Sequence, residues 1–230
     1  MHALWTAAKL KRRLIKHAYR SIATCYPSQD LFDDLVNKDQ ISTLQDIENR
    51  TSEINQNMPQ KNRVFQYFDS SSTLYVFCQP SFWGGRFSDG SFGVWYGALE
   101  EETSIQEALH WSSTFVAPDL NNTRNPITID RRMFQVSLDH ECTADFRESA
   151  DLYPLLTHPK DYSLCRELGH EAIEQKIGFL LTPSARRQGG TCSPTFAPEV
   201  ITEEKTIYYL RFTFAIGQDP VWTKSPSVLM

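Results

Sequence analysis

The chain of 230 residues contains no long hydrophobic run. A membrane-spanning helix needs about 18 or more consecutive apolar residues, so we expect no membrane span. Cysteine is also scarce, and the five cysteines are scattered along the chain. Structural zinc sites usually need paired Cys or His ligands a few residues apart, so we expect no bound metal. Isolated cysteines are typical of free thiols in a reducing cytoplasm.

The sequence likewise lacks an excess of positive charge. Its formal net charge is -5 at pH 7, which gives no general attraction for phosphate backbones. We therefore expect no direct binding to nucleic acid. The chain is 40% hydrophobic and 12% aromatic, which is enough to bury a substantial core.

Residues 1–29 depart from this balance, since they carry six basic residues and no acidic one. Leu14, Ile15, Ala18 and Ile22 fall roughly on one helical stripe, so the pattern predicts a basic amphipathic helix. We favour packing of its apolar stripe on the main domain. A membrane surface or a targeting role stays open as an alternative.

A domain boundary is predicted near residue 62. Short helices are expected at 28–36 and 40–50, and residues 50–62 form a polar stretch typical of a linker. The sequence thus predicts an N-terminal helical segment over 1–62 and a main domain over 63–230.

The main domain shows mixed strand and helix signals. Runs rich in aromatic and β-branched residues, or with period-two alternation, predict strands at Arg63–Phe68, Leu74–Cys78, Ser91–Ala98, Met133–Leu138, Ile177–Leu181 and Thr206–Ile216. A capping-box pattern at Thr103 and Gln106 predicts a helix start, and Asp161–Lys176 has helical periodicity. This order predicts an α+β domain with bent mixed or antiparallel sheets and flanking helices.

Four residues could carry chemistry, although each has an ordinary structural interpretation. Arg86 follows two glycines, so its guanidinium could hold a pyrophosphate, but such glycine pairs most often form plain turns. Tyr96 suits a half-buried strand and Glu107 a solvated helix face. Ser184 follows a buried strand and Pro183, where turns are common, and no His-Asp pair is placed to activate it.

Three blocks of the sequence together resemble the RES-domain family of NAD-degrading toxins. The blocks are Gly84-Gly85-Arg86-Phe87-Ser88, Val94-Trp95-Tyr96-Gly97-Ala98 with Ser104-Ile105-Gln106-Glu107-Ala108, and Gly178 to Phe196 with Pro183-Ser184-Ala185-Arg186. Their order and spacing are more specific than any block alone. The resemblance covers about residues 63 to 215.

This resemblance implies a fold similar to ADP-ribosylating toxins and a set of site residues. The implied catalytic residues are Arg86, Tyr96 and Glu107, and the implied NAD-binding residues are Arg86, Phe87, Ser88, Tyr96 and Ser184. Glu107 would stabilise the ribose as nicotinamide leaves, and Arg86 would hold the pyrophosphate. Tyr96 would face the nicotinamide riboside, and Ser184 would bond a phosphate or the nicotinamide amide.

The implied function is a cytoplasmic toxin that depletes NAD by cleaving its nicotinamide-ribose bond. NAD is the substrate, inorganic phosphate is a candidate co-substrate for phosphorolysis, and no metal is needed. An ADP-ribosyltransferase acting on a protein and a non-catalytic interaction module stay open as alternatives. The implied partner is a separate antitoxin of the Xre type, and homo-oligomerisation stays open.

The sequence departs from the family pattern at two positions. Gln66 follows Val64 and Phe65 where the family usually has an aromatic residue and arginine, and Cys192 replaces a frequent asparagine. We expect the loss of one cation to affect phosphate affinity before it affects bond cleavage.

Overall fold

The computed structural model describes Trp5 and residues 10–23, 75–78, 84–149 and 154–224. Within these residues the strands are β1 (Lys11–Ile22), β2 (Trp95–Ala98), β3 (Ile127–Asp145), β4 (Phe179–Pro183), β5 (Thr191–Thr195), β6 (Ile201–Phe214) and β7 (Val221–Lys224). The α-helices are α4 (Tyr75–Cys78), α5 (Glu101–Leu120) and α6 (Ser163–Glu174). Short 3-10 helices span Arg147–Ser149, Pro154–Leu156 and Pro198–Val200.

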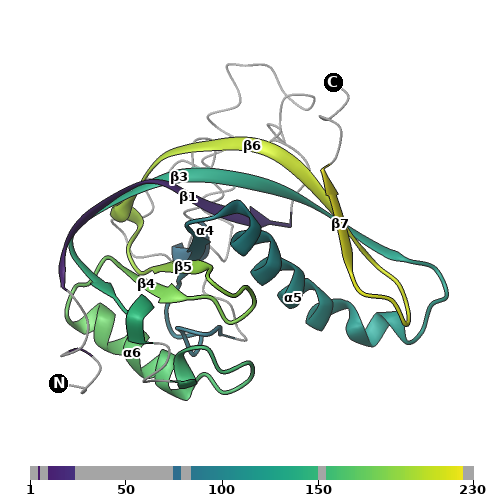
Figure 1. Cartoon of the computed structure of the whole chain (residues 1–230), viewed down its shortest axis with the longest axis horizontal. Helices are drawn as coiled ribbons and strands as arrows, with labels where there is room; N and C mark the ends of the chain where they lie inside the picture. The colour runs from purple at the N-terminus through teal and green to yellow at the C-terminus, as the bar shows by residue number, and fades with distance from the viewer. Residues whose placement is uncertain (1–4, 6–9, 24–74, 79–83, 150–153, 225–230) are drawn as a thin grey trace, which may run out of the picture.

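The described strands form one mixed sheet of seven strands in the order β1-β2-β5-β4-β3-β6-β7. β1 also pairs with β3, so β1, β2, β5, β4 and β3 form a closed ring of pairings. The pairing of β3 with β4 is parallel, and the other pairings are antiparallel. Figure 1 shows the long strands β1, β3 and β6 arched over α5 and the β4–β5 pair. The predicted α+β class with a bent mixed sheet is confirmed.

Three apolar clusters hold these layers together. One joins α6 to the ends of β3 and β4, a second lies within the ring of strands around Trp95, and a third packs α5 against β3 and β6. Helices α6 and α5 therefore each cover a different part of the sheet.

The predicted N-terminal helix is wrong over residues 11–22, which form β1. Its apolar residues misled the prediction because the pairing of β1 with β3 is irregular between Ile15 and Ala18. Such an irregularity breaks the period-two pattern of a strand. The other parts of the predicted 1–62 segment, apart from Trp5, residue 10 and residue 23, lie outside the described residues, as do the boundary near 62 and Gln66.

Most of the other predicted elements appear with shifted ends. β2, β3, β4 and β6, as well as α5 and α6, correspond to predicted strands and helices. The strand predicted at Leu74–Cys78 is wrong, because Tyr75–Cys78 forms a short helix. A short run rich in aromatic residues suits a buried turn of helix as well as a strand. The strand Arg63–Phe68 lies outside the described residues.

The predicted capping box is also misplaced. Helix α5 begins at Glu101 with Glu100 as N-cap, three residues before the predicted N-cap Thr103. The Glu100 carboxylate accepts hydrogen bonds from Thr103 Oγ1 at 2.6 Å and from the Thr191 amide at 2.9 Å. This one side chain therefore ties the start of α5 to β5.

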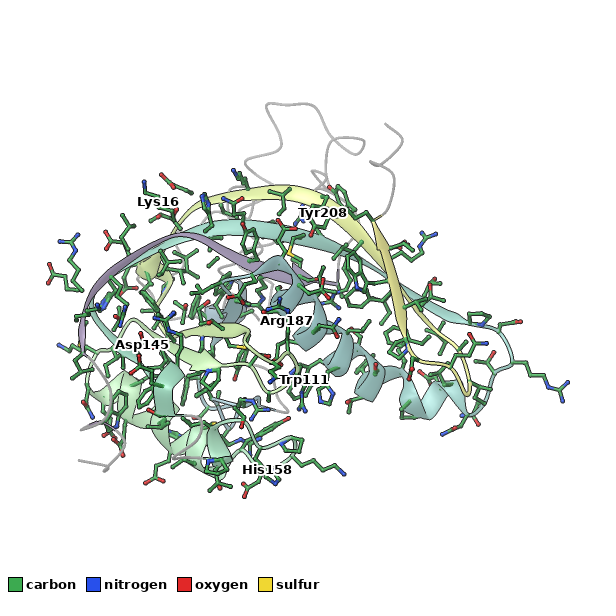
Figure 2. The ribbon with its side chains drawn as sticks, in the orientation of Figure 1. Lys16, Trp111, Asp145, His158, Arg187 and Tyr208 are labelled. Atoms are coloured by element: carbon green, nitrogen blue, oxygen red, sulfur yellow. The ribbon has the colours of Figure 1, made fainter. Side chains whose placement is uncertain are left out.

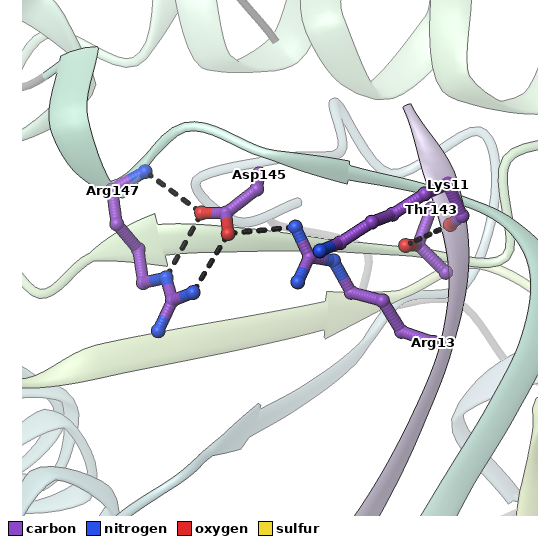
Figure 3. Close-up of polar contacts among 5 residues, drawn as sticks. All are labelled: Lys11, Arg13, Thr143, Asp145 and Arg147. Carbon is purple, nitrogen blue, oxygen red and sulfur yellow. Dashed lines mark hydrogen bonds and ion pairs between the residues drawn. The ribbon is translucent and has the colours of Figure 1, made fainter. Parts of the chain in front are cut away.

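A charged cluster lies where β3 ends. The Asp145 carboxylate accepts hydrogen bonds from Arg13 Nη2 at 2.8 Å and from Arg147 Nη2 at 2.7 Å (Figure 3). Arg13 belongs to β1, so the cluster joins the two strands at their ends. No helix among the described residues is both long and apolar enough to cross a membrane.

Candidate functional site

Arg86 projects from a tight turn that its neighbours fix. Gly84 has φ +66°, a region that L side chains rarely adopt, and a Cβ there would lie 2.6 Å from the Ser88 carbonyl oxygen. The Gly85 amide donates to this same carbonyl at 2.7 Å. The Ser88 hydroxyl donates to the Phe92 carbonyl at 2.6 Å. The turn therefore needs the two glycines for its shape and presents Arg86 at a defined position.

The Arg86 guanidinium is held by the loop before α6. Its Nη1 donates to the carbonyl of His158 at 2.8 Å and to that of Leu156 at 3.4 Å. Its Cζ lies 4.5 Å from the centroid of the Tyr162 ring, within the range of a cation-π contact. These contacts orient the guanidinium, and none of them cancels its charge.

Tyr96 lies directly beside this turn. It is the second residue of β2, and its hydroxyl accepts a hydrogen bond from the Phe87 amide at 3.0 Å. Burial raises the pKa of the hydroxyl well above its ordinary value, so the phenol stays protonated. Part of the ring is exposed. The first and second sequence blocks are thus joined by a hydrogen bond.

Glu107, on α5, is bonded to the third sequence block. The Ser184 hydroxyl donates to Glu107 Oε1 at 2.6 Å, and the Cys192 thiol contacts the same oxygen at 3.5 Å. Ser184 follows the end of β4, and its Oγ also accepts from the amides of Arg186 and Arg187, each at 3.1 Å. The Ser184 hydroxyl is thereby fully engaged in orienting the carboxylate.

Two other titratable groups, Cys192 and His110, lie near both Arg86 and Glu107. The pKa of the Cys192 thiol is raised by burial and by Glu107, and the Arg86 guanidinium opposes this rise. The pKa of the His110 imidazole is lowered by burial and by Arg186, with Arg86 adding to the effect and Glu107 opposing it. Both groups therefore feel the guanidinium and the carboxylate at once, so the blocks converge on one region.

The family model of the RES domain matches residues 66–215. This match covers more than half of the 230-residue chain. The chain belongs to the RES domain family.

Two further comparisons add little to this assignment of the RES domain. A chain in the crystal structure of the M. tuberculosis MbcT-MbcA toxin-antitoxin complex is similar at 12% identity, with 89% of each chain covered and a TM-score of 0.44. None of the curated proteins compared with the chain matches it.

Two residues that were predicted to bind NAD, Phe87 and Ser88, have partners within the fold. The Phe87 side chain is only 1% exposed and belongs to the apolar cluster beside α6. The Ser88 hydroxyl is used within the turn, where it also accepts from the Gly90 amide at 3.0 Å. Contact of these side chains with a ligand stays a prediction, and their placement favours a supporting role for Arg86.

The sequence interpretation missed several residues that lie near the candidate site. Tyr162 contacts Arg86, and its ring lies 6.4 Å from that of Trp111, which is 45% exposed. Trp111 lies one helical turn after Glu107, so the spacing could have indicated a shared face. Arg20 of β1 lies 5.8 Å from the Trp95 ring and acts electrostatically on Tyr96. The sequence interpretation missed Arg20 because it assigned residues 11–22 to a helix instead of a strand. In the view of Figure 2, the Arg187 label lies above that of Trp111 and the His158 label lies below it.

Metal ligands do not gather in the part of the RES domain that the structure describes. Among the described residues, no group of three or more His, Cys, Asp or Glu side chains could hold a metal ion.

Proposed function

We propose that this RES domain cleaves the nicotinamide-ribose bond of NAD, by hydrolysis or phosphorolysis, and acts as a cytoplasmic toxin by depleting NAD. The observation that carries the proposal is the carboxylate of Glu107, oriented by the Ser184 hydroxyl, which also accepts a hydrogen bond from the Arg186 amide. Family membership supports the assignment, because the three converging groups are those that the resemblance implies.

Glu107 would stabilise the charge that develops during bond cleavage. As neutral nicotinamide leaves, positive charge builds on the ribose, and a nearby carboxylate stabilises it. Both hydrogen bonds to Glu107 go to Oε1, so among the described residues Oε2 has no hydrogen-bond partner. We assign Oε2 to the ribose, or to the water or phosphate that attacks it.

Arg86 and Tyr96 would bind the two sides of the scissile bond. A guanidinium suits a pyrophosphate because it presents several N–H donors and a fixed charge. The partly exposed Tyr96 ring offers a flat surface to the nicotinamide riboside, while its hydroxyl is committed to the Phe87 amide.

Ser184 would be a positioning residue. The Ser184 hydroxyl donates to Glu107 and accepts from two amides. This geometry disfavours a direct hydrogen bond from Ser184 to a phosphate or to the nicotinamide amide. We therefore propose that Ser184 acts through the carboxylate, and that Cys192 assists it with a weaker donor.

An antitoxin of the Xre type would be the partner, as the resemblance of the sequence blocks to the toxin family implies. Its site of contact on this chain is left open. Co-purification with the product of a neighbouring gene, followed by loss of NAD cleavage, would be the expected behaviour of such a pair.

The experiment for the proposed reaction follows nicotinamide release. The purified chain is incubated with NAD, with and without phosphate, and free nicotinamide is separated by chromatography, with Glu107→Gln as the control. Free ADP-ribose supports hydrolysis, and its phosphorylated form supports phosphorolysis. Label from NAD retained on a protein band would favour ADP-ribosyl transfer instead. No release above the control under either condition would reject the proposal.

A further inference from the structure

Three arginines surround Tyr162. The Cζ atoms of Arg86 and Arg166 lie 4.5 Å and 6.0 Å from the centroid of the Tyr162 ring. Arg186 Nη2 donates a hydrogen bond to the Tyr162 hydroxyl at 3.3 Å. These arginines come from the turn before β2, from α6 and from the loop after β4, so the fold brings together guanidinium groups that are distant in the sequence.

Backbone carbonyls hold the three guanidinium groups in place. The bonds run from Arg86 to the carbonyl of His158 (2.8 Å), from Arg186 to that of Pro159 (2.8 Å) and from Arg166 to that of Gly85 (3.1 Å). Within the described residues, no ion pair joins any of these arginines to a carboxylate. A carbonyl fixes a guanidinium without neutralising it, so the cluster keeps its positive charge. In addition, the Arg186 Nε is buried and finds no hydrogen-bond partner among the residues that the structure describes.

The neighbouring carboxylates are engaged elsewhere. Glu107 Oε1 receives Ser184 Oγ and the Cys192 thiol. Asp161 accepts a hydrogen bond from the Ser163 amide at 3.0 Å, at the start of α6. Neither carboxylate therefore compensates the three arginines through an ion pair.

A cluster of like charges is unfavourable unless an anion joins it. We propose that Arg86, Arg166 and Arg186 form, together with Tyr162, a site for phosphate oxyanions. Its occupant is either the pyrophosphate of the dinucleotide or the inorganic phosphate that attacks the ribose. This inference rests on the proposed NAD cleavage and deepens it, since it adds two arginines and a tyrosine to the binding site.

The position of the cluster suits either occupant. The Ser184 hydroxyl donates to Glu107 Oε1 and accepts from the Arg186 amide, so the arginine cluster lies next to the carboxylate. In NAD the pyrophosphate is joined directly to the ribose that undergoes cleavage, and an attacking phosphate must approach that same ribose. A phosphate site next to Glu107 is therefore where both chemistries require one.

Calorimetry of the full-length chain tests this proposal without relying on catalysis. We expect Arg186→Ala to weaken binding of ADP-ribose about tenfold to hundredfold, the usual loss for one charge-assisted hydrogen bond. Arg124→Ala, which removes an exposed arginine in the turn before β3, is the matched control and should bind as the wild type does. Arg186→Lys keeps the charge but not the fork of donors, so an intermediate affinity is expected.

Titration with inorganic phosphate distinguishes the two sources of oxyanion. If the pyrophosphate occupies the site, Arg186→Ala raises KM for NAD, and phosphate displaces ADP-ribose. If the co-substrate occupies it, the same change raises KM for phosphate and leaves KM for NAD close to that of the wild type. Unchanged affinity of a folded Arg186→Ala chain for both ligands would overturn the proposal, as would a wild-type chain that binds neither.

These results are separable from the proposed reaction. A chain that binds ADP-ribose through Arg186 but releases no nicotinamide would keep the phosphate site and reject the NAD cleavage. Conversely, nicotinamide release that is indifferent to Arg186→Ala and Arg166→Ala would keep the reaction and reject the phosphate site.

Discussion

Two groups of arginines in this chain are held in opposite ways. At the end of β3, Arg13 and Arg147 share the Asp145 carboxylate, and both contacts are ion pairs (Figure 3). Around Tyr162, backbone carbonyls hold the guanidinium groups of Arg86, Arg166 and Arg186. The first group has its counter-charge within the fold, whereas the second leaves charge available for a ligand. The comparison predicts that mutations at Asp145 affect stability and that mutations near Tyr162 affect binding and turnover.

The largest expected effect is that of Glu107→Gln on turnover. The change removes the negative charge that stabilises the developing positive charge of the ribose, so nicotinamide release should fall by about 100-fold or more. The thermal midpoint should stay near that of the wild type, because an amide can still accept from Ser184 Oγ. A variant that retains most of the activity would place the stabilising charge elsewhere.

Ser184→Ala should have the next largest effect, through the orientation of Glu107. Loss of a hydrogen bond to a charged group costs about 1.5–3 kcal/mol, which predicts a fall in kcat of about tenfold to hundredfold with little change in KM. Steady-state kinetics separate the two constants. Ser113→Ala is a matched control on α5, since the Ser113 hydroxyl only donates to the Leu109 carbonyl. A rise in KM without a fall in kcat would instead indicate that Ser184 binds the substrate.

Asp145→Asn should sharpen the comparison by lowering stability with little effect on turnover. We expect a loss of about 2 kcal/mol in the free energy of unfolding, because three charge-assisted hydrogen bonds weaken, one from Arg13 and two from Arg147. Burial tends to raise the pKa of Asp145, but hydrogen bonds from Arg147 and the charges of Arg147 and Arg13 outweigh it and lower the pKa overall.

The lowered pKa gives this difference a defined pH dependence. Its stabilising contribution is fully present above the ordinary carboxyl pKa of about 4 and is lost as the pH falls through the lower, folded-state value. Denaturant unfolding of the wild type and Asp145→Asn should thus differ by a constant amount from pH 7 to about 5 and converge below about 4. A difference that persists at low pH would contradict the ion-pair account.

The smallest expected effect concerns the two thiols nearest the site. Burial raises the pKa of Cys165 to about 11, and burial with Glu107 raises that of Cys192 well above its ordinary value. Both thiols should stay protonated at pH 8, so we expect much slower alkylation by iodoacetamide in the folded chain than after denaturation. Mass spectrometry of the modified peptides measures both rates. Rapid alkylation of Cys192 in the folded chain would contradict the raised pKa of its thiol beside the carboxylate.

The sequence predicted the fold where local patterns agreed with tertiary packing. α6 and the buried strand β4 have the expected periodicity and run of apolar residues, and both appear in the structure. β1 was misassigned because its irregular pairing with β3 disrupts the alternation of a strand. β5 (Thr191–Thr195) was missed, since it contains Ser193 and Pro194 and owes its place to strands on both sides.

The site shows a similar division. Arg86, Tyr96, Glu107 and Ser184 lie in sequence blocks with recognisable spacing, and the fold brings these blocks together. Tyr162 and Arg166 lie in a segment with no such spacing. Their contacts with Arg86 and Gly85 depend on how the loop before α6 meets the turn before β2, which no local pattern of residues encodes.

The proposed cleavage of NAD depends on Glu107, which Ser184 orients beside the arginines around Tyr162. The most direct test is the amount of free nicotinamide released from NAD by the purified wild-type chain and by Glu107→Gln, measured side by side. We expect release by the wild type, with or without a requirement for phosphate, and at least about 100-fold less by the variant. Equal release from both chains, or none from either, would contradict the account.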